Sequence, residues 1–509
     1  MLKAENLISK QRYYIVTGVV IFLMLILLSR FFYLQIFRYE KYKHKAEINR
    51  IRAVTVNAPR GLILDRNGNI LVDNYPTYIL TAIPGEMEQK EKIFNSISQC
   101  TGIDSLIIAE NFKKYYRAKF VPTRLMKDLT FHQISILEEN ILDLPGVNYK
   151  QFPERYYPSR INGSHFLGYL KEVDKPVQEK LGNPNVYELG DLIGWSGLEK
   201  FYESQLKGTR GVKYLEVDAL GREMEEVKGY NNRRSEPGAD IRLMIDADLQ
   251  LLMEEKMKDY RGIAVLSNPK TGEILAYVSK PDYPPNIFTG KMLKDDWNEV
   301  RNDPHRPLID RVITGLYPPG STFKIVALAA AFDQELITLD SVFFCHNGKY
   351  HAPGLFLSDH RAFSYLSSRE ILSQSSNIGA FFIAKKVEDR SGVGTFDDYI
   401  KRFGFGTRTG IELTAESAGM VTSPEDRTWS RTSLSRIAMG YEIDVTALQM
   451  ASALSVIANG GNLFEHINDA DEWFKINYKG QFAFTHQNNA ELKLVDFADD
   501  FDYLDLVAI

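Results

Sequence analysis

The stretch "YPPGSTFKIVALAAAF" (residues 317–332) is the most informative part of this chain. Its Pro-Pro-Gly entry stops the preceding element, and from Ser321 onward the residues are apolar and strongly helix-forming, which predicts a buried helix. Ser321 and Lys324 are three residues apart, so on a helix they share a face. Serine is a weak nucleophile until a base removes its proton, and a lysine buried in an apolar pocket can become that base. The stretch therefore predicts Ser321 as a nucleophile at a helix N-terminus and Lys324 as its general base.

The Ser-x-x-Lys pattern is weak by itself, because a chain of this length contains such pairs by chance. Another copy, Ser204 to Lys207, lies in a charged stretch that ends at a glycine, and we expect no catalysis there. The alternative for Ser321 is a helix-capping serine with a surface lysine one turn later. The continuous apolar sequence after Lys324 and the rigid Pro-Pro-Gly entry favour the catalytic interpretation.

A further motif lies about 54 residues after the nucleophile, in "REILSQSSNIGAFFIAKKV" (369–387). It contains Ser375-Ser376-Asn377 just before an apolar helix, a Ser-x-Asn pattern. Ser375 could relay a proton and contact substrate, and Asn377 could bind a peptide group of the substrate. The alternative is a helix cap, since serine and asparagine favour that position. Because it follows Ser321 at this distance, we favour the catalytic role.

Size and charge limit the class of protein. A chain of 509 residues can form two or three domains. The formal net charge of -5 at pH 7 offers no reason to expect nucleic acid as a partner. The two cysteines, Cys100 and Cys345, are far apart in sequence, and we predict that both thiols are unpaired.

An apolar segment near the start predicts a membrane anchor. Seventeen uncharged residues lie between Arg12 and Arg30 and are followed by "RFFYLQIF", which suits a helix that just crosses a bilayer. The absence of a small-x-small cleavage site favours an uncleaved anchor over a signal peptide. Basic residues flank the segment on both sides, so charge does not decide its orientation.

Turn and linker signals divide the rest of the chain. Asn67-Gly68, flanked by alternating apolar residues, predicts a hairpin. The polar stretch 231–240, which contains Pro237-Gly238, predicts a linker before a strand and an amphipathic helix. "GIAVLSNPKTGEILAYVS" (262–279) predicts two strands joined by the turn 268–272. The segment 464–509 is different in character, because it has no proline or arginine and ten acidic residues against three lysines.

Around these motifs the chain resembles a class B penicillin-binding protein, a monofunctional peptidoglycan D,D-transpeptidase. The resemblance extends over about residues 12–463 and includes further landmarks in family order. The first half is similar to the elongation branch, penicillin-binding protein 2, whereas "SSNIG" and "MGYEIDVTALQ" are similar to the septal branch; we favour elongation. The landmarks are "APRGLILDRNG" (58–68), "YYPSRINGSHFLGYL" (156–170), "GWSGLEKFYESQLKGTRG" (194–211), "IDADLQ" (245–250), "NPKTGEILAYVSKPDYPPN" (268–286) and "SVIANGG" (455–461).

The resemblance implies an α+β multidomain fold. It has a single N-terminal transmembrane helix, an elongated mixed α/β pedestal domain, and a transpeptidase domain with an antiparallel sheet and helices that is incomplete at its C-terminus. The bulk of the chain would lie on the periplasmic side of the inner membrane. The expected parts are a cytoplasmic tail (1–12), the anchor (13–37), the pedestal or dimerisation-type domain (38–235), the transpeptidase domain (236–463) and an atypical tail (464–509).

The resemblance also implies the chemistry and the partners. Ser321 would attack the penultimate D-Ala carbonyl of a stem peptide, with Lys324 as base, Ser375 as proton shuttle and Asn377 as substrate contact. β-Lactams would trap Ser321, and no cofactor is required. The implied partners are peptidoglycan stem peptides, lipid-linked nascent glycan, a SEDS-type membrane glycosyltransferase and other proteins of the elongation complex.

One family element is unaccounted for. Relatives carry Lys-Ser/Thr-Gly on a sheet strand well downstream of Ser-x-Asn. Here Lys270-Thr271-Gly272 precedes Ser321 and falls in a predicted turn, and Arg408-Thr409-Gly410 follows Ser375 too closely. We expect both to be structural. The hypothesis is a truncated or frame-shifted chain whose tail replaces the missing strands, and the less favoured one is a catalytically inactive homologue.

Two further alternatives stay open. The chain could be a non-catalytic scaffold whose pedestal docks a membrane glycosyltransferase, or a septal rather than an elongation enzyme. In addition, "CHNGKYHAPGLFLSDH" (345–360) gathers metal-ligating residue types, although the spacing matches no standard zinc site and polar loop residues are the default. The zinc set would be Cys345, His346, His351, Asp359 and His360.

Overall fold

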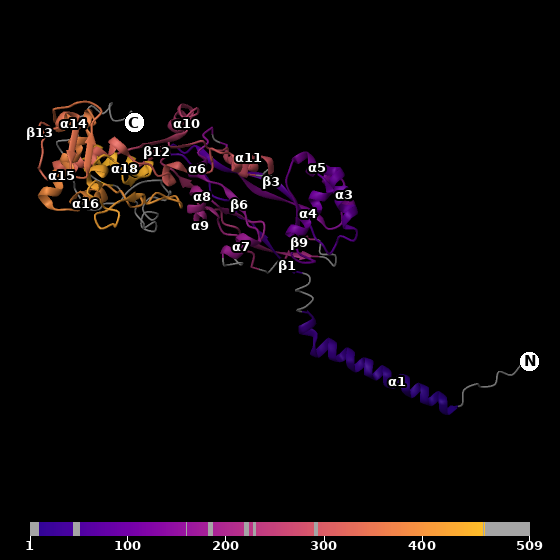
Figure 1. The fold of residues 1–509 in the computed structure, drawn as a ribbon. Helices are drawn as coiled ribbons and strands as arrows, with labels where there is room; N and C mark the ends of the chain where they lie inside the picture. Colours follow the sequence, from indigo (N-terminus) through magenta and orange to yellow (C-terminus); the bar gives the residue numbers. More distant parts are fainter. Residues whose placement is uncertain are drawn as a thin grey trace, which may run out of the picture.

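Three parts follow one another along the chain (Figure 1). A long helix stands apart near the N-terminus, a strand-rich part follows it, and a mainly helical part lies at the far end of an elongated body. The computed structural model describes residues 10–43, 51–158, 160–181, 187–217, 223–227, 231–289, 294–461 and residue 463.

The N-terminal helix has the dimensions of a membrane span. Helix α1 (Lys10–Phe32) continues into a π-helical turn, η1 (Tyr33–Phe37). The segment Tyr13–Phe37 is long and apolar enough to cross a membrane, and it is the only such helix among the described residues. Its large apolar side chains are exposed. This agrees in length and composition with the predicted anchor.

The pedestal is built around one long strand. β3 (Ile70–Ala82) pairs antiparallel with β5 (Val147–Tyr156) on one side and with β4 (Thr123–Leu129) and β2 (Ile63–Leu64) on the other. β10 (Ile241–Arg242) joins the sheet by pairing parallel with β2. The chain that leaves the pedestal therefore lies beside a strand from the beginning of the pedestal.

The Asn67-Gly68 hairpin prediction is confirmed. β2 and β3 are antiparallel with Ile63 opposite Val72, and Gly68 adopts φ +90°, which favours glycine. The Asp65 carboxylate accepts hydrogen bonds from the backbone N–H of Asn67 at 2.9 Å and of Asn69 at 2.7 Å. The side chain thus holds the turn closed.

Helices at one end of the pedestal cover the sheet with their apolar faces. Phe94 on α3 and Phe112 on α4 pack ring against ring with centroids 5.5 Å apart, within a core that also contains Leu80 and Leu125 from the sheet. The remaining pedestal elements are α3 (Lys90–Thr101), α4 (Ser105–Tyr115), α5 (Phe131–Glu139), η2 (Ile141–Asp143), α6 (Ser164–Leu167), β6 (Leu170–Glu172), α7 (Lys175–Leu181), β7 (Leu192–Gly194), α8 (Gly197–Phe201), α9 (Glu203–Leu206), and the sheet of β1 (Ile51–Val56), β8 (Gly211–Val217) and β9 (Glu223–Glu226).

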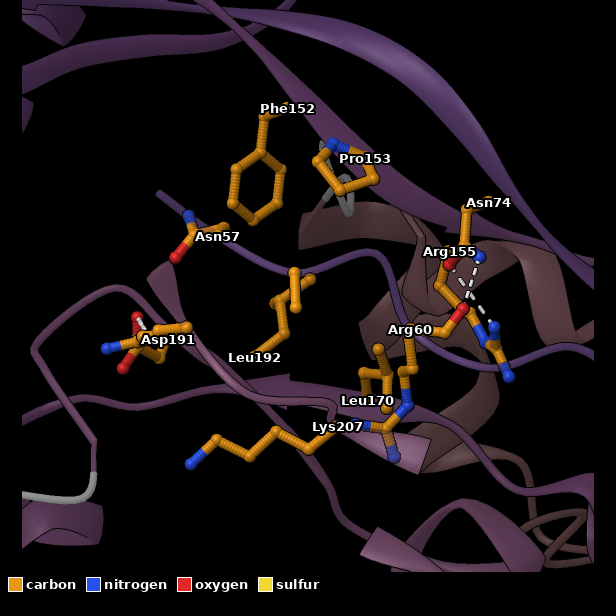
Figure 2. A pocket seen from close by; sticks show the side chains of 12 residues that line it. Asn57, Arg60, Asn74, Phe152, Pro153, Arg155, Leu170, Asp191, Leu192 and Lys207 are labelled. Carbon is orange, nitrogen blue, oxygen red and sulfur yellow. Dashed lines mark hydrogen bonds and ion pairs between the residues drawn. The ribbon is translucent and has the colours of Figure 1, made fainter. Parts of the chain in front are cut away.

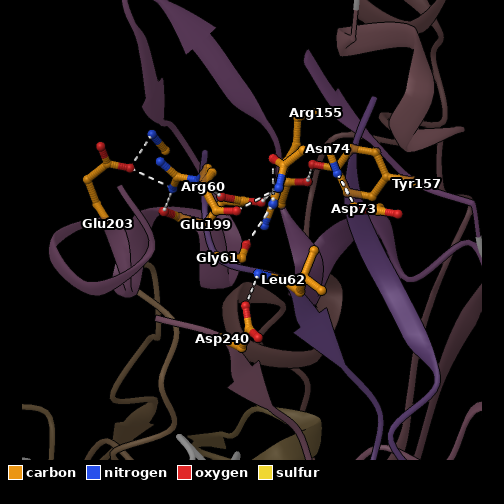
Figure 3. Close-up of polar contacts among 12 residues, drawn as sticks. Arg60, Gly61, Leu62, Asp73, Asn74, Arg155, Tyr157, Glu199, Glu203 and Asp240 are labelled. Atoms are coloured by element: carbon orange, nitrogen blue, oxygen red, sulfur yellow. Dashed lines mark hydrogen bonds and ion pairs between the residues drawn. The ribbon is translucent and has the colours of Figure 1, made fainter. Parts of the chain in front are cut away.

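A buried ion network ties distant pedestal segments together (Figure 3). The Arg60 guanidinium donates to Glu199 and to Glu203, both at 2.6 Å, and Arg155 donates to the other oxygen of Glu199 at 2.6 Å and to the carbonyl of Gly61 at 2.7 Å. Glu199 is fully buried. Two guanidinium groups on one carboxylate compensate the cost of burying these charges.

The predicted linker 231–240 is not a free loop. Arg233 exchanges backbone hydrogen bonds with Val212 at 2.8 and 2.9 Å, and Glu236 does the same with Thr209 at 2.9 Å. A Cβ on Gly238 would lie 1.8 Å from the carbonyl oxygen of Leu206, so only glycine fits there. The polar composition predicts a linker, but β8, on the side away from β1 and before its pairing with β9 begins, supplies backbone partners that the local sequence does not reveal.

The far part of the body is organised around one buried helix, α13 (Lys324–Asp333). Every residue of α13 from Lys324 to Ala331 is buried. It packs against α15 (Asn377–Ser391), α16 (Thr395–Arg402) and α17 (Ser433–Ala438), and these helices share one apolar core. The prediction of a buried helix after the Pro-Pro-Gly entry is confirmed.

A two-stranded hairpin accompanies these helices. β11 (Gly262–Ser267) and β12 (Ile274–Lys280) pair antiparallel as predicted, and α10 (Ala247–Lys256) packs on β12. Within the described residues this sheet has two strands; the tail 464–509 lies outside them. The other elements are η3 (Pro285–Phe288), α11 (Lys294–Asn302), α12 (Arg311–Thr314), η4 (Gly320–Phe323), β13 (Val342–Phe344), η5 (His346–Gly348), β14 (Lys349–Ala352), β15 (Leu355–Ser358), β16 (Tyr365–Ser367), α14 (Ser368–Ser373), β17 (Met420–Val421), β18 (Ile443–Asp444) and α18 (Ala447–Ala458).

Candidate active site

The nucleophile segment turns once before its helix begins. Ser321 lies in the 3-10 turn η4 and is exposed, whereas α13 starts at Lys324, so the expectation that the α-helix begins at Ser321 is wrong by one turn. The reason is a tertiary contact. Gly320, at φ +57°, donates its N–H to the carbonyl of Gly440 at 3.1 Å. A Cβ on Gly440 would lie 2.1 Å from the Gly320 oxygen, so this approach requires glycine.

Lys324 is buried beneath the exposed serine. Its ammonium nitrogen donates to the carbonyl oxygen of Ser375 at 2.6 Å and to its hydroxyl at 2.9 Å. Burial lowers the pKa of Lys324 to about 8, although the negative charge of Asp359 acts in the opposite direction. An amine with such a pKa is partly neutral near pH 7 and can accept a proton there.

Ser375 connects the lysine to the nucleophile. Its hydroxyl donates to the Ser321 hydroxyl at 2.7 Å, which completes a hydrogen-bonded chain from Ser321 through Ser375 to Lys324. Ser375 has φ +53°, a left-handed conformation that costs a non-glycine residue about 1–2 kcal/mol. The fold therefore brings together the two motifs that the sequence separates by about 54 residues.

Asn377 occupies the first turn of α15 beside Ser375. Its side-chain amide donates to the carbonyl of Ser358 at 3.0 Å, and its backbone N–H donates to Asp359 at 2.5 Å. Ser376 is the residue that caps this helix, through its hydroxyl and the N–H of Gly379 at 2.9 Å. Ser376 therefore provides the helix cap, while the Ser375 hydroxyl lies 2.7 Å from that of Ser321; the catalytic role of Ser375 stays a prediction. The substrate contact of Asn377 stays a prediction.

The two tripeptides that resemble the Lys-Thr-Gly motif are structural, as expected. Lys270-Thr271-Gly272 forms the turn between β11 and β12, where Gly272 has φ +75° and donates to the Asn268 carbonyl at 2.8 Å. In the Arg-Thr-Gly tripeptide, Thr409 and Gly410 donate backbone N–H groups to the Glu416 carboxylate at 2.7 and 3.2 Å. The sequence of 464–509 contains no Lys-Ser/Thr-Gly, and the replacement of missing strands by this tail concerns residues outside the described ones.

The five residues of the zinc hypothesis do not converge, because the described residues contain no group of three or more His, Cys, Asp or Glu side chains close enough to hold a metal. Asp359 is bound to the start of α15, and the His346 ring packs on Phe344, with centroids 4.5 Å apart. His351 packs on a phenylalanine of the neighbouring strand, and His360 does so on Phe363. The Cys, His and Asp residues of 345–360 are close in sequence, but their side chains do not meet at one point. Side chains alternate between the two faces of a strand, and the histidine rings pack on aromatic neighbours.

Both cysteines are free, as predicted, with Cys345 buried. Its sulfur lies 3.7 Å from the hydroxyl oxygen of Ser376, and burial raises the pKa of the thiol. Cys345 is therefore a neutral packing residue behind the Ser-x-Asn loop.

The other Ser-x-x-Lys pair lies in the pedestal. Lys207 lines a small cavity of about 70 Å³ together with Arg60 and Arg210 (Figure 2). Its ammonium nitrogen lies 3.5 Å from the ring centre of Tyr187, and Ser204 donates to the neighbouring Gln205 at 2.7 Å. The expectation of a non-catalytic pair agrees with this geometry.

Sequence reasoning missed two residues of this site. Gly440 fixes the turn that carries the nucleophile, and Asp359 holds the start of the Ser-x-Asn helix. Gly440 lies in a family landmark and could have been singled out as a glycine that a close backbone approach requires. Asp359 was named only as a possible zinc ligand, and nothing local pointed to its role at the loop, because its partners are 17 to 19 residues further along the chain.

The fold and the paired motifs define a serine acyl-transfer protein of the penicillin-binding class. Residues 55–243 match the penicillin-binding protein dimerisation domain and residues 262–488 match the penicillin-binding protein transpeptidase domain. The chain belongs to this family, as a class B member. The transpeptidase match ends inside the segment 464–509 that differs in composition from the rest of the chain.

Curated relatives share the organisation over most of the chain. Peptidoglycan D,D-transpeptidase MrdA of Acinetobacter baumannii is 29% identical over 481 residues, which is 91% of this chain and 69% of the relative. MrdA of Escherichia coli K12 is 28% identical over 449 residues, 86% of this chain and 70% of the relative. Stage V sporulation protein D of Bacillus subtilis is 29% identical over 479 residues, with shares of 91% and 67%.

Solved structures show the same fold. Penicillin-binding protein PBP2 of Helicobacter pylori, in its complex with MreC, superposes with a TM-score of 0.72 at 20% identity, over 86% of this chain and 79% of that one. PBP2 from the same organism, in another structure, superposes with a TM-score of 0.67 at 21% identity, over 86% and 82%.

Proposed function

We propose that this chain is a membrane-anchored peptidoglycan D,D-transpeptidase that cross-links stem peptides during cell elongation. The observation that carries the proposal is the hydrogen-bonded chain from Ser321 through Ser375 to a buried Lys324 whose pKa is about 8. An exposed nucleophile, a relay hydroxyl and a base with a lowered pKa are what serine acyl transfer requires.

Acylation begins with attack by Ser321 Oγ on the penultimate D-Ala carbonyl. The Ser321 proton passes through Ser375 to the neutral amine of Lys324, and a helix N-terminus next to Ser321 favours the developing negative charge. The relay then returns the proton to the departing D-Ala amine. An amine of a neighbouring stem peptide then attacks the ester, the relay takes up a proton from that amine, and the relay returns it to the Ser321 oxygen as the ester bond breaks and the new peptide bond remains. No cofactor takes part in these steps.

Substrate binding is assigned to the same loop. The Asn377 amide lies beside the relay serine and could exchange its bond to Ser358 for a bond to the stem-peptide backbone. β-Lactams present a reactive carbonyl to Ser321 in place of D-Ala-D-Ala and leave a stable acyl-enzyme.

The elongation role is supported by relatives named MrdA and by the likeness to PBP2 structures. The proposed setting is the inner membrane, crossed by Tyr13–Phe37, with the pedestal and the transpeptidase part outside the cytoplasm. The proposed partners are lipid-linked nascent glycan, a SEDS-type glycosyltransferase and other elongation-complex proteins. The H. pylori PBP2 structure is a complex with MreC, and an MreC-like protein is a candidate partner here.

One surface of the pedestal suits such a partner. A cleft of about 720 Å³ lies between α4, β4 and β6 of the pedestal and the η3–α11 segment. Aromatic side chains line it, among them Tyr169 and Phe288, whose rings stack with centroids 3.8 Å apart, and Trp195, which is 37% exposed. Exposed aromatic side chains are typical of protein interfaces.

Fluorescent penicillin labelling of the purified full-length chain tests the enzymatic proposal. We expect a covalent adduct that mass spectrometry places on the peptide containing Ser321, and no adduct in Ser321→Ala. Folded wild-type protein that takes up no label would overturn the proposal and favour the non-catalytic scaffold. A cross-linking assay on lipid-linked glycan then separates a transpeptidase from a protein that only binds penicillin.

A further inference from the structure

Asp359 lies at the end of β15 with its carboxylate against the Ser-x-Asn loop. Oδ1 accepts the backbone N–H of Asn377 at 2.5 Å and that of Ile378 at 3.1 Å, and Oδ2 accepts the Ser376 hydroxyl at 2.7 Å. One carboxylate therefore engages three consecutive residues at the start of α15. Free N–H groups at a helix start favour a negative charge, so the geometry is electrostatically matched.

These bonds determine where the loop before the helix can lie. Ser376 is held from both sides, since its hydroxyl donates to Asp359 and accepts the Gly379 N–H at 2.9 Å. Ser375 precedes it in a left-handed conformation, with its N–H donated to the Leu372 carbonyl at 3.0 Å. A strained residue keeps its conformation only where its neighbours are held on both sides. Helix α14 provides one side and Asp359 provides the other.

Ser358, the last residue of β15, binds the Asn377 side chain. The Ser358 carbonyl accepts from the Asn377 amide at 3.0 Å, next to the Asp359 contact with the Asn377 backbone. The end of β15 thus contacts both the backbone and the side chain of the residue assigned to substrate binding.

We infer that Asp359 is a positioning residue for acyl transfer, which holds the Ser-x-Asn loop so that the Ser375 hydroxyl bridges Ser321 and Lys324. The inference rests on the proposed function, because Ser375 needs this position only if it relays a proton. The hydrogen bonds of Asp359 go to Ser376, Asn377 and Ile378, so it acts on the relay through the loop.

The negative charge of Asp359 also affects the pKa of Lys324. Asp359 raises the pKa of Lys324 against the larger, lowering effect of burial. The nearby Cys345 thiol has a pKa raised by burial and is neutral, and the adjacent His360 ring packs on Phe363. Replacing Asp359 by a neutral side chain is therefore expected to lower the pKa of Lys324 further.

Two substitutions separate position from charge. Asp359→Ala removes all three acceptor contacts, and we expect the rate constant for acylation by penicillin to fall on the order of 100-fold, the effect of displacing a reacting group by about 1 Å. Asp359→Asn keeps an acceptor for the two N–H groups but loses the charge. We expect a smaller loss, about tenfold, and an acid limb of the pH–rate profile displaced to lower pH.

The matched control is Asp246→Asn. Asp246 also caps a helix, α10, by accepting the backbone N–H groups of Asp248 at 3.1 Å and Leu249 at 3.2 Å. This change is expected to leave the acylation rate and the pH profile at their wild-type values. If Asp359 were only a helix cap, Asp359→Ala and Asp359→Asn would likewise leave the acylation rate and the pH profile unchanged.

Hydrogen exchange provides a readout that needs no activity. In the full-length protein, Asp359→Ala should increase exchange of the amides of Asn377 and Ile378, while Asp246→Asn leaves them protected. Unchanged protection in Asp359→Ala, or acylation within about threefold of wild type with an unshifted pH profile in both variants, overturns the inference. If wild-type protein is not acylated at all, the proposed function fails, and the exchange result still decides whether Asp359 holds the loop.

Discussion

Two buried sites in this molecule hold cationic side chains, one with carboxylate partners and the other with neutral oxygen partners. In the pedestal, Arg60 and Arg155 share the carboxylate of Glu199 (Figure 3). In the transpeptidase part, Lys324 is equally buried, but its hydrogen bonds go to the neutral oxygens of Ser375.

The pKa shifts follow from this difference. Burial alone would lower the pKa of Arg60, but Glu199 and Glu203 outweigh it and raise the pKa. At Lys324 burial dominates and the pKa falls to about 8. Paired charges stabilise a fixed structure, whereas a buried charge without a carboxylate in hydrogen-bond contact becomes a titratable, reactive group.

The largest effect is expected from removing the base. Lys324→Met keeps the length of the side chain and removes the amine, and we expect penicillin acylation to fall about 10²–10⁴-fold, the usual contribution of a general base. The folded state should not be weakened, because no buried charge is left without a partner. Stopped-flow labelling measures the rate. The control is Lys207→Met in the other Ser-x-x-Lys pair; an equal loss there would show that the sites do not differ in role.

The opposite result is expected in the pedestal. Glu199→Gln leaves the buried Arg155 guanidinium without its carboxylate and leaves Arg60 with Glu203 alone, and it should lower the free energy of unfolding by about 3–5 kcal/mol. Denaturant unfolding of the full-length protein measures this. Glu188→Gln, which removes an exposed pair with Arg117 at 2.7 Å, should cost at most about 1 kcal/mol. At low temperature Glu199→Gln should still be acylated at close to the wild-type rate; a catalytic defect in folded protein would contradict the comparison.

The pH dependence of acylation sharpens the same contrast. Lys324 must be neutral to accept a proton, so the rate should rise about tenfold per pH unit below the pKa of about 8 and level off above it. The pKa of the paired Arg60 is raised, so the pedestal contributes no change in this range. Labelling between pH 6 and 9.5 tests this, and a flat profile would mean that Lys324 is not the titrating base.

The smallest effect is expected at the Lys-Thr-Gly turn. Lys270→Ala changes an exposed turn residue between β11 and β12, and acylation should stay within about twofold of wild type, with stability changed by less than about 0.5 kcal/mol. A loss of tenfold or more would place this tripeptide in the active site and refute its assignment as a turn.

Local signals are reliable wherever the determining interaction is close in sequence. The Asn67-Gly68 hairpin, the turn at 268–272 and the apolar helix after Pro-Pro-Gly are predictable, since turn chemistry and helix propensity act within a few residues. The ligand types gathered in 345–360 form no convergent group among the described residues, because nearness in sequence is not nearness of side chains. The polar composition of 231–240 predicts a free linker, but its backbone pairs with β8.

The class of chemistry is already encoded in the order of residues, because a serine three residues before a lysine in an apolar helix, with a Ser-x-Asn motif downstream, restricts the groups that can react. How those groups meet depends on packing between distant segments. That packing set Ser321 in a 3-10 turn against Gly440, placed the Ser375 hydroxyl 2.7 Å from it, and brought Asp359 to the start of α15. Each of these contacts joins residues at least 17 positions apart, and such distances are set by packing and burial, which no local pattern encodes.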